Sequence, residues 1–498
     1  MILWSAIILL GVLLRLAMLL SQKSLWGDEW FSIGLVQHRL ADVWRGSVND
    51  VHPPLYFLLL KLSVMLGGFN EISFRAVSFL AGVGTLFSCY ALGKELFSER
   101  EGVLASGFAA ISPYFIQSSN EIRSYSLLAF LSGATLCFFL KMVRTSGRRW
   151  AAAYVLSALG MIYAEHYGYF VLLATSVTLF CLSGPAKKSR VCLTAQTLLF
   201  LGCLPGAVFL LMPQAIFREH LLEAARVTEY WSWPILVKKF FGVYWQMASG
   251  YAFSMLTVDR ILFYARHSFY FWFSLANAGI FFVAVGKGLI ELSRRSRQTG
   301  ILAIMVLFVP VVFLMGFYPI RLSARYLAFA EPLFLTMGAA GFLALGHRAL
   351  RGCLAALFVL VSCVGAGGSI LGKTDPLHKE DYVSQIRYVF QNAGKDDAIS
   401  GLGVAVDYYQ KRLGLSTEAK ILPELSDLTG QSLREVYRVW VLDSANMHSE
   451  VENRNHRTIS TILSSFGFVS SGPTQRFGGE DGLNVVYCYE RKFDALLS

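Results

Sequence analysis

The chain has 498 residues, of which 55% are hydrophobic and only 15% carry a charge. A soluble domain has about 25% charged residues, so this composition excludes a water-soluble enzyme, a disordered chain and a disulfide-stapled secreted module. The formal net charge is +11, an excess that fits either nucleic acid or a membrane as the partner.

The distribution of charge decides between these partners. Residues 373–498 hold 14 of the 44 Lys and Arg and 17 of the 33 Asp and Glu, which leaves 30 basic and 16 acidic residues in 1–372. The surplus positive charge therefore lies in short loops between apolar runs. That is the positive-inside pattern of a polytopic membrane protein, and it argues against a nucleic-acid partner.

Residues 2–20 form the first stretch long and apolar enough to span a bilayer, which takes about 17–25 residues. We expect it to be an uncleaved first helix and not a signal peptide. Arg15 near its end is expected to snorkel or to face a cavity. Ten further spans are expected at roughly 74–97, 102–118, 125–141, 150–163, 167–182, 190–212, 268–286, 300–318, 326–346 and 352–371.

Basic residues in four loops orient these spans, because cytoplasmic loops carry an excess of Lys and Arg. With the N-terminus inside the cell, all four loops are cytoplasmic and the C-terminal tail lies outside the cell (inner) membrane. The basic residues are Lys141, Arg144, Arg148 and Arg149, then Lys187, Lys188 and Arg190, then Lys287, Arg294, Arg295 and Arg297, and then Arg348 and Arg351. The outer segments are then 21–73, 119–124, 164–166, 213–267 and 319–325.

The number of crossings depends on the 13-residue apolar stretch Pro54–Leu66. We interpret it as an interfacial or re-entrant helix, because it is short for a span. This gives about eleven crossings. If the stretch crosses, a further crossing is needed to keep the charge pattern, which gives thirteen.

A change of composition near residue 373 divides the chain. We expect an all-α transmembrane domain at 1–372, with a functional outer loop at 21–73, and a small soluble α/β domain at 373–498 outside the membrane. In this tail we expect helices at 380–393 and 456–465 and strands near 398–401, 436–442 and 484–489. The run from Gly401 to Gly403 lacks a third glycine and is interpreted as a tight turn, not a dinucleotide loop.

Polar residues gather most densely in the first outer loop, at Trp26–Trp30 and again at His52–Tyr56. Asp28 and Glu29 lie between two tryptophans, which suggests a carboxylate in a partly dry pocket at the membrane surface. Adjacent side chains point in different directions on any regular backbone, so the two acids are expected to have different tasks. The alternative is that both simply occupy a helix N-terminus, where acids are common.

The other outer segments contribute cations and aromatic rings. Arginine suits a phosphate because its guanidinium donates two parallel hydrogen bonds and stays charged at any pH. Anchoring to lipid headgroups explains such arginines equally well. The candidate residues are Glu121, Arg123, His166, Arg321, Arg325 and Tyr326.

His52 stands before two prolines, which impose a rigid, extended entry into the apolar stretch. It could act as a base, a ligand or a cap. No HExxH or paired-histidine motif is present, and we predict no metal site. Asp28, Glu29 and His52 could still converge on a divalent cation, so a cation remains an open alternative.

The order of these motifs resembles membrane glycosyltransferases of the GT-C fold, in particular the glycosyltransferase family 39-like group, which is related to protein O-mannosyltransferases and to the aminoarabinose transferases that modify lipid A. The resemblance covers about residues 1–370. It rests on Leu25-Trp26-x-Asp28-Glu29, His52-Pro53-Pro54-Leu55-Tyr56 with the leucines after it, Phe74-Arg75, Ser112-Pro113, Glu121-x-Arg123-x-Tyr125, His166-Tyr167 and Arg325-Tyr326-Leu327.

The resemblance implies sugar transfer from a polyprenyl-phosphate-linked donor to a hydroxyl of a protein, lipid or glycan at the outer membrane face. It also implies that Asp28, with Glu29 beside it, carries the catalytic carboxylate. The leaving group is an anion, so Arg123, Arg321 and Arg325 are the expected phosphate-binding cations. A single base opposite a departing phosphate describes one in-line displacement, so we expect inversion at the anomeric carbon.

Two other functions compete with this reading. A transporter or lipid flippase tends to show internal repeats and broken helices at the bilayer midplane, whereas here the polar residues collect toward one face. A non-catalytic scaffold would depend on its outer domain and not on Asp28.

Overall fold

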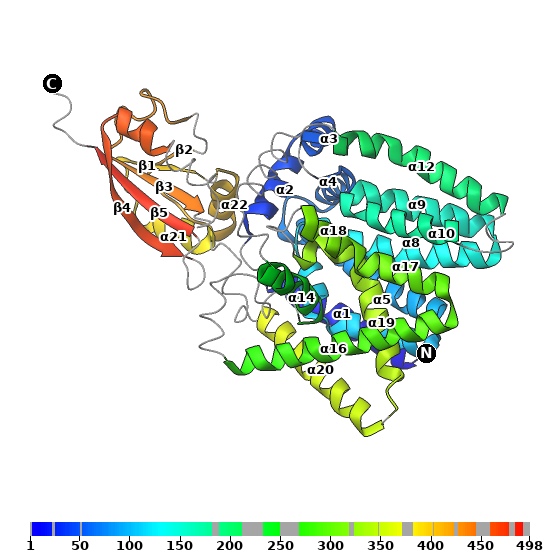
Figure 1. Cartoon of the computed structure of the whole chain (residues 1–498). Helices are drawn as coiled ribbons and strands as arrows, with labels where there is room; N and C mark the ends of the chain where they lie inside the picture. The colour runs from blue at the N-terminus through cyan, green and yellow to red at the C-terminus, as the bar shows by residue number, and fades with distance from the viewer. Residues whose placement is uncertain are drawn as a thin grey trace. The chain divides into compact units, whose positions relative to one another are not determined.

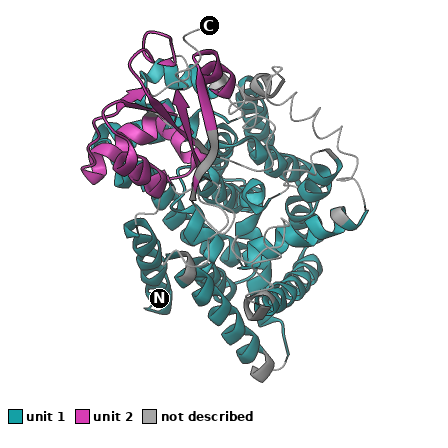
Figure 2. Cartoon of the chain, turned by 90° about the vertical axis from the view of Figure 1, so that its left-hand side faces the viewer, with its two compact units in different colours: residues 1–22, 35–374 teal, residues 23–34, 375–498 magenta. Residues whose placement is uncertain are grey.

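The computed structural model describes residues 2–21, 25–49, 52–181, 189–211, 233–249, 268–317, 323–346, 348–370, 382–401, 403–422, 427–444, 459–477 and 484–491. Their contacts divide the chain into two compact units (Figure 2). The membrane unit comprises residues 1–22 and 35–374, and the C-terminal unit comprises residues 23–34 and 375–498. Residues 23–34 of the first outer loop therefore group with the tail.

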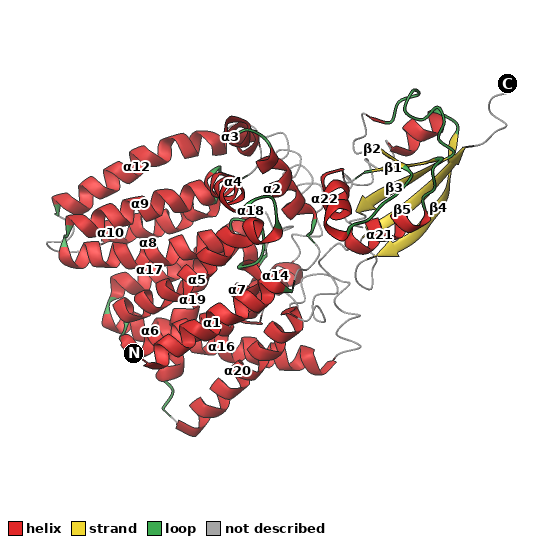
Figure 3. Ribbon diagram, turned by 180° about the vertical axis from the view of Figure 1, so that it is seen from behind, coloured by secondary structure: helices red, strands yellow, loops and turns green. Residues whose placement is uncertain are grey.

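The described part of the membrane unit is helical (Figures 1 and 3). Helix α2 (Gly27–Gln37) runs across the boundary between the two units. The remaining helices are α1 (Ile2–Leu20), α3 (Leu40–Asn49), α4 (Leu55–Gly67), α5 (Glu71–Leu96), α6 (Glu99–Ile111), α7 (Pro113–Ser118), α8 (Tyr125–Thr145), α9 (Arg148–Ala164), η1 (His166–Gly168), α10 (Tyr169–Cys181), α12 (Arg190–Leu211), α14 (Trp233–Ser249), α16 (Ser268–Arg295), α17 (Arg297–Leu307), α18 (Val309–Phe317), η5 (Ala324–Ala330), α19 (Glu331–Leu343) and α20 (Arg348–Ile370).

Six helical segments are long and apolar enough to cross a membrane: Ile2–Leu20, Glu71–Leu96, Tyr125–Thr145, Trp272–Arg295, Arg297–Gly316 and Ala324–Leu343. Four shorter apolar helices accompany them, including Leu55–Gly67, where the sequence predicts an interfacial or re-entrant helix. Together with the structural matches given below, these helices confirm a multi-pass membrane domain that a small α/β domain follows in the chain. The described residues also include α14, which lies in the predicted outer segment 213–267 and was not expected as a helix.

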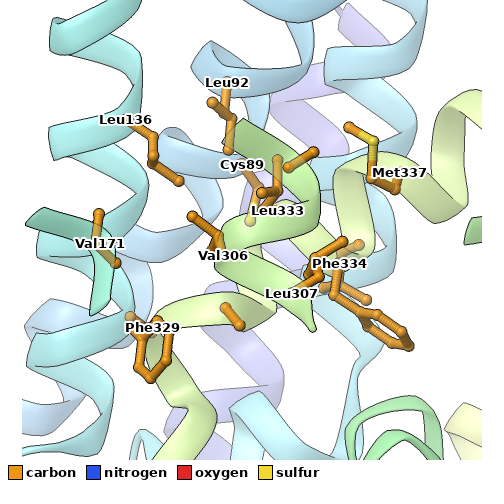
Figure 4. Packing of buried hydrophobic residues seen from close by; sticks show 14 of the residues in the cluster. Cys89, Leu92, Leu136, Val171, Val306, Leu307, Phe329, Leu333, Phe334 and Met337 are labelled. Carbon is orange, nitrogen blue, oxygen red and sulfur yellow. The ribbon is translucent and has the colours of Figure 1, made fainter. Parts of the chain in front are cut away.

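The core of the membrane unit lies where α5, α8, α17 and α19 meet (Figure 4). Small residues allow α16 and α19 to approach closely, as is usual between membrane helices. A Cβ atom on Gly288 would stand 2.1 Å from the carbonyl oxygen of Met337, and one on Gly341 would stand 1.7 Å from that of Ala284. Neither glycine can be replaced without separating the two helices.

Arg15 in α1 is completely buried and does not snorkel. Its guanidinium donates to the carbonyl oxygens of Gly11 at 3.0 Å, Ala109 at 3.1 Å and Ala110 at 3.3 Å, and to the hydroxyl of Ser119 at 3.1 Å. Ala109 and Ala110 lie in the last turn of α6, where carbonyls have no partner within the helix. Arg15 therefore caps α6 and binds α1 to it.

The C-terminal unit contains a five-stranded sheet in the order β2-β1-β3-β5-β4. Strands β2, β1 and β3 run parallel, and β5 pairs antiparallel with both β3 and β4. The elements are α21 (Tyr382–Asn392), β1 (Asp397–Ser400), α22 (Gly403–Leu413), β2 (Lys420–Leu422), β3 (Arg438–Ser444), β4 (Phe468–Phe477) and β5 (Asn484–Arg491). Helix α22 and strands β2 and β4 were not expected from the sequence.

A buried carboxylate joins β1 to β3. Asp397 accepts hydrogen bonds at 3.0 Å from both Nε and Nη2 of Arg438 and from Nε1 of Trp440, and at 2.8 Å from the backbone N–H of Gly394. After β1 the chain turns at Gly401, whose φ of +94° suits glycine alone. Helix α22 begins two residues later, so this turn leads directly into a helix.

Candidate active site

The predicted site residues divide between the two units. His52, Glu121, Arg123, His166, Arg325 and Tyr326 belong to the membrane unit, whereas Asp28 and Glu29 belong to the C-terminal unit. Arg321 lies outside the described residues. The two groups are therefore described separately.

The centre of the membrane group is a buried polar cluster, formed by His52, Arg123, Ser124 and Glu165. His52 Nδ1 lies 3.1 Å from Glu165 Oε2, and the hydroxyl of Ser124 donates to the same oxygen at 2.7 Å. His52 Nε2 contacts Arg123 Nη2 on its other side. Glu165 is 1% exposed and Arg123 is 7% exposed, so these charges interact in a medium of low polarity.

The contact with Arg123 determines which ring nitrogen of His52 carries the proton. A guanidinium has only donors and keeps its charge in proteins, so His52 Nε2 must accept and must be unprotonated. Nδ1 then carries the hydrogen and donates it to Glu165. In this arrangement His52 is neutral and its only lone pair is committed to Arg123, so the imidazole orients the guanidinium and is not available as a base.

Glu165 is the anion that balances this cluster. Burial by itself raises the pKa of a carboxyl group. The hydrogen bonds from His52 and from the hydroxyl of Ser124, with the proximity of His166, overcome that effect and hold the pKa of Glu165 well below its usual range. The backbone N–H of His166 also donates to the other carboxylate oxygen at 3.2 Å. Glu165 is therefore ionised at neutral pH.

The short segment between α7 and α8 carries Glu121 and Arg123, and neighbouring helices hold its backbone. Arg75 of α5 donates to the carbonyl oxygen of Asn120. The hydroxyl of Ser78, one turn further along α5, donates to the carbonyl oxygen of Arg123 at 3.2 Å and lies 2.9 Å from the hydroxyl of Tyr56. These contacts fix the backbone from which the Arg123 side chain projects.

Aromatic rings connect this cluster to the second predicted arginine. The ring of Tyr326 lies 5.2 Å from that of Tyr167 and 6.5 Å from that of Tyr125. Arg325 lies over the Tyr326 ring at 5.0 Å and donates to its hydroxyl at 3.1 Å. Tyr125 and Tyr167 follow Ser124 and His166 directly in the chain. The predicted residues from four distant segments thus meet in the membrane unit.

Gln246 of α14 positions the start of η5, which carries Arg325 and Tyr326. Its side-chain oxygen accepts from the backbone N–H of Ala324 at 2.9 Å and from the hydroxyl of Ser323 at 3.3 Å. Gln246 is 3% exposed. The sequence offered no signal for this role, because α14 itself was not expected. Glu165 is not among the predicted site residues, since its pairing with His52 spans 113 positions.

The two acids of the C-terminal unit differ in exposure and in contacts. Glu29 is completely buried, and its Oε2 accepts from the backbone N–H of Trp26, the residue before α2, at 3.2 Å. This is the reach-back contact of a capping box. Asp28 is partly exposed. Glu29 therefore stabilises the start of α2, and Asp28 is the acid that reaches solvent.

Within the described ranges no three His, Cys, Asp or Glu side chains are grouped so as to hold a metal ion. In the membrane unit, the described predicted cations are Arg123, which contacts His52, and Arg325, which lies over the Tyr326 ring.

Comparison with known proteins places these residues in context. Residues 51–217 match the family described as dolichyl-phosphate-mannose-protein mannosyltransferase. The matched region contains His52, Arg123 and Glu165. No curated protein matches the chain significantly.

Solved structures match nearly the whole chain. ArnT from Cupriavidus metallidurans, in its apo state, has a TM-score of 0.53 at 12% identity, and the match covers 97% of this chain and 98% of that one. The oligosaccharyltransferase from Archaeoglobus fulgidus, tethered to an acceptor peptide, has a TM-score of 0.53 at 11% identity, with 99% and 74% covered. The chain has the GT-C fold of membrane glycosyltransferases. At this identity the structural match establishes the GT-C fold alone, and together with the family match it indicates a glycosyltransferase.

A third structure has the same GT-C fold with a lipid bound. It is the Archaeoglobus fulgidus oligosaccharyltransferase AglB in complex with an inhibitory peptide and a dolichol-phosphate, with a TM-score of 0.51 at 11% identity, and the match covers 98% of this chain and 74% of that one. This match, too, extends over nearly the whole of this chain.

Proposed function

We propose that this protein transfers a sugar from a polyprenyl-phosphate-linked donor to a hydroxyl group of a protein, lipid or glycan at the outer face of the cell membrane, with inversion at the anomeric carbon. The observation that carries the proposal is the buried Arg123–His52–Glu165 cluster, in a chain whose fold and family match are those of glycosyltransferases. A fixed guanidinium, together with Arg325 as a second cation, suits a leaving group that departs as a phosphate.

Asp28 is the proposed general base. Its carboxylate takes the proton of the acceptor hydroxyl while the hydroxyl oxygen forms a bond to the anomeric carbon. The bond from that carbon to the phosphate oxygen breaks, and the electron pair leaves with the polyprenyl phosphate. Partial exposure of Asp28 leaves room for an acceptor, whereas Glu29 is buried and committed to the start of α2.

Arg123 and Arg325 are the proposed cations for the leaving phosphate. Negative charge grows on the phosphate during bond cleavage, so preorganised donors stabilise the transition state more than the ground state. Glu165 and the neutral His52 keep Arg123 in one orientation. The Tyr326 ring does the same for Arg325, since the guanidinium lies over the ring and donates to its hydroxyl.

The proposal is tested in two steps. Mass spectrometry of glycolipids and glycoproteins from cells with and without the protein identifies the missing product. The purified protein is then given polyprenyl-phosphate-linked sugars and the identified acceptor, and wild type is compared with Asp28→Asn and Arg123→Gln. We expect covalent transfer by wild type, and a loss of at least about 100-fold in folded protein for each substitution. Movement of the lipid across liposomes without transfer would instead establish the transporter alternative.

A further inference from the structure

A feature outside the polar cluster concerns the segment that carries Asp28. Residues 23–34 belong to the C-terminal unit. The backbone N–H of Leu25 donates to the hydroxyl of Tyr409, at 2.9 Å and 384 positions away. Leu25 and Tyr409 are both completely buried. An interior hydrogen bond that ties a backbone amide to a side chain of another element restricts that backbone.

Aromatic packing reinforces the same attachment. The Trp30 ring lies 5.4 Å from Tyr409 and 5.6 Å from Tyr408, in edge-to-face geometry in both cases. The two tyrosine rings are 5.4 Å apart. The three rings restrict one another's motion. Edge-to-face pairs of this kind stabilise a fold by more than their buried area alone would contribute. Leu25 and Trp30 lie on either side of Asp28 in the chain, so both flanks of the acid are held.

The tyrosines stand on a helix that is itself built into the sheet unit. Ala405 and Val406 are buried on α22 together with Tyr409, and α22 follows β1 through the turn at Gly401. A Cβ at Gly401 would lie 2.4 Å from the carbonyl oxygen of Leu442 in β3. The attachment point for the acidic segment is therefore a fixed part of the fold of the C-terminal unit.

We propose that the C-terminal unit serves as a positioning element of the active site, and that Tyr409, supported by Tyr408, holds residues 25–30 so that Asp28 keeps the orientation that proton transfer needs. The inference rests on the proposed function of Asp28. Tyr409 touches the segment and not the reacting atoms, so it acts through the backbone of Leu25 and the ring of Trp30. Loss of this contact then lowers kcat while the KM for the donor stays the same.

The first test measures the attachment without any substrate. Hydrogen exchange of residues 25–34 is compared in the full-length protein for wild type, Tyr409→Phe and Tyr409→Ala. Tyr409→Phe removes only the hydroxyl that accepts from Leu25, so exchange there should accelerate roughly 2- to 10-fold, and Tyr409→Ala should add the loss of ring packing. Tyr437→Phe is the matched control, because Tyr437 is 43% exposed in the same unit. Unchanged exchange in both Tyr409 variants would overturn the inference.

The second test measures turnover with the donor and product identified for the proposed function. We expect kcat to fall modestly in Tyr409→Phe and up to roughly 100-fold in Tyr409→Ala, with an unchanged donor KM. If exchange accelerates but both variants turn over like wild type while Asp28→Asn is inactive, the attachment has no positioning role. Full activity of Asp28→Asn would instead refute the proposed function of Asp28, and the positioning inference would fall with it.

Discussion

His52 accepts a hydrogen bond from Arg123 through Nε2 and donates one to Glu165 through Nδ1, at 3.1 Å. The neutral imidazole thus hydrogen-bonds a buried carboxylate on one side and a buried guanidinium on the other, and so links the orientation of the two groups. Such an arrangement determines where a cation points, which is the requirement for binding a departing phosphate.

Replacing His52 with Gln or with Asn tests the role of its accepting nitrogen separately from that of its donating nitrogen. The terminal amide of Gln reaches about as far as Nε2, so His52→Gln can still accept from Arg123, whereas the shorter Asn reaches only as far as Nδ1. We expect His52→Asn to lose roughly 10- to 100-fold in kcat/KM, the value of a hydrogen bond to a charged group, and His52→Gln to lose less. Equal losses in transfer assays would contradict the role in orienting Arg123.

Substitution of Glu165 has a stability effect with a defined pH range. The pKa of Glu165 is lower in the folded protein than its ordinary value of 4.5, so the ionised carboxylate stabilises the fold above pH 4.5, and this stabilisation is lost as the pH falls through the lowered pKa. We expect Glu165→Gln to destabilise the fold by roughly 1.5–3 kcal/mol at pH 7, the range for hydrogen bonds to charged groups. In thermal unfolding, the difference in stability between wild type and Glu165→Gln should be constant between pH 7 and 5. It should shrink below about pH 4.5.

The two adjacent acids should separate stability from catalysis. Asp28→Asn should reduce kcat by roughly 10²- to 10⁴-fold, the usual contribution of a general base, with little change in thermal unfolding. Glu29→Ala removes the acceptor for Trp26 at the start of α2 and should lower stability by about 1 kcal/mol. If Glu29→Ala unfolds like wild type while it loses transfer activity as completely as Asp28→Asn, the roles assigned to the two acids are wrong.

The cap of α6 provides a prediction unrelated to the chemistry. Arg15→Met leaves the carbonyl oxygens of Ala109 and Ala110 without their buried donor, and each such group costs several kcal/mol inside a membrane. We expect a markedly lower unfolding temperature in detergent. Arg100→Met in the same helix replaces an exposed arginine and should unfold like wild type.

Much of the helical fold follows from local properties that a sequence displays. Spans such as Tyr125–Thr145 were predicted because hydropathy and length suffice to identify a helix that crosses lipid. The positions where a helix is interrupted were not predicted. The expected span 102–118 is divided at Ser112, before Pro113, and the expected span 300–318 is divided at Phe308, before Val309. Helix α14 escaped prediction, because it lies in a segment of mixed polarity between two expected spans.

The site was predicted in its residues but not in its pairings. Composition and order identified His52, Arg123 and Tyr326 as candidates, yet nothing in the sequence connects His52 with Glu165 or Tyr326 with Tyr167. These pairings depend on how the helices pack, which no local pattern encodes. The hydrogen bond between Leu25 and Tyr409 could not be predicted either, because it joins the first outer loop to a helix near the other end of the chain.

Arg15 has a further consequence for how the protein is made. Among the described residues, its guanidinium donates to Gly11 in its own helix and otherwise only to oxygens of residues 109–119. The first helix thus leaves the ribosome about a hundred residues before its partners exist, with a charge that lipid solvates poorly. Until the chain around Ser119 has been synthesised, the guanidinium lacks these partners, so the N-terminal helix reaches its final packing only after residues 109–119 are in place.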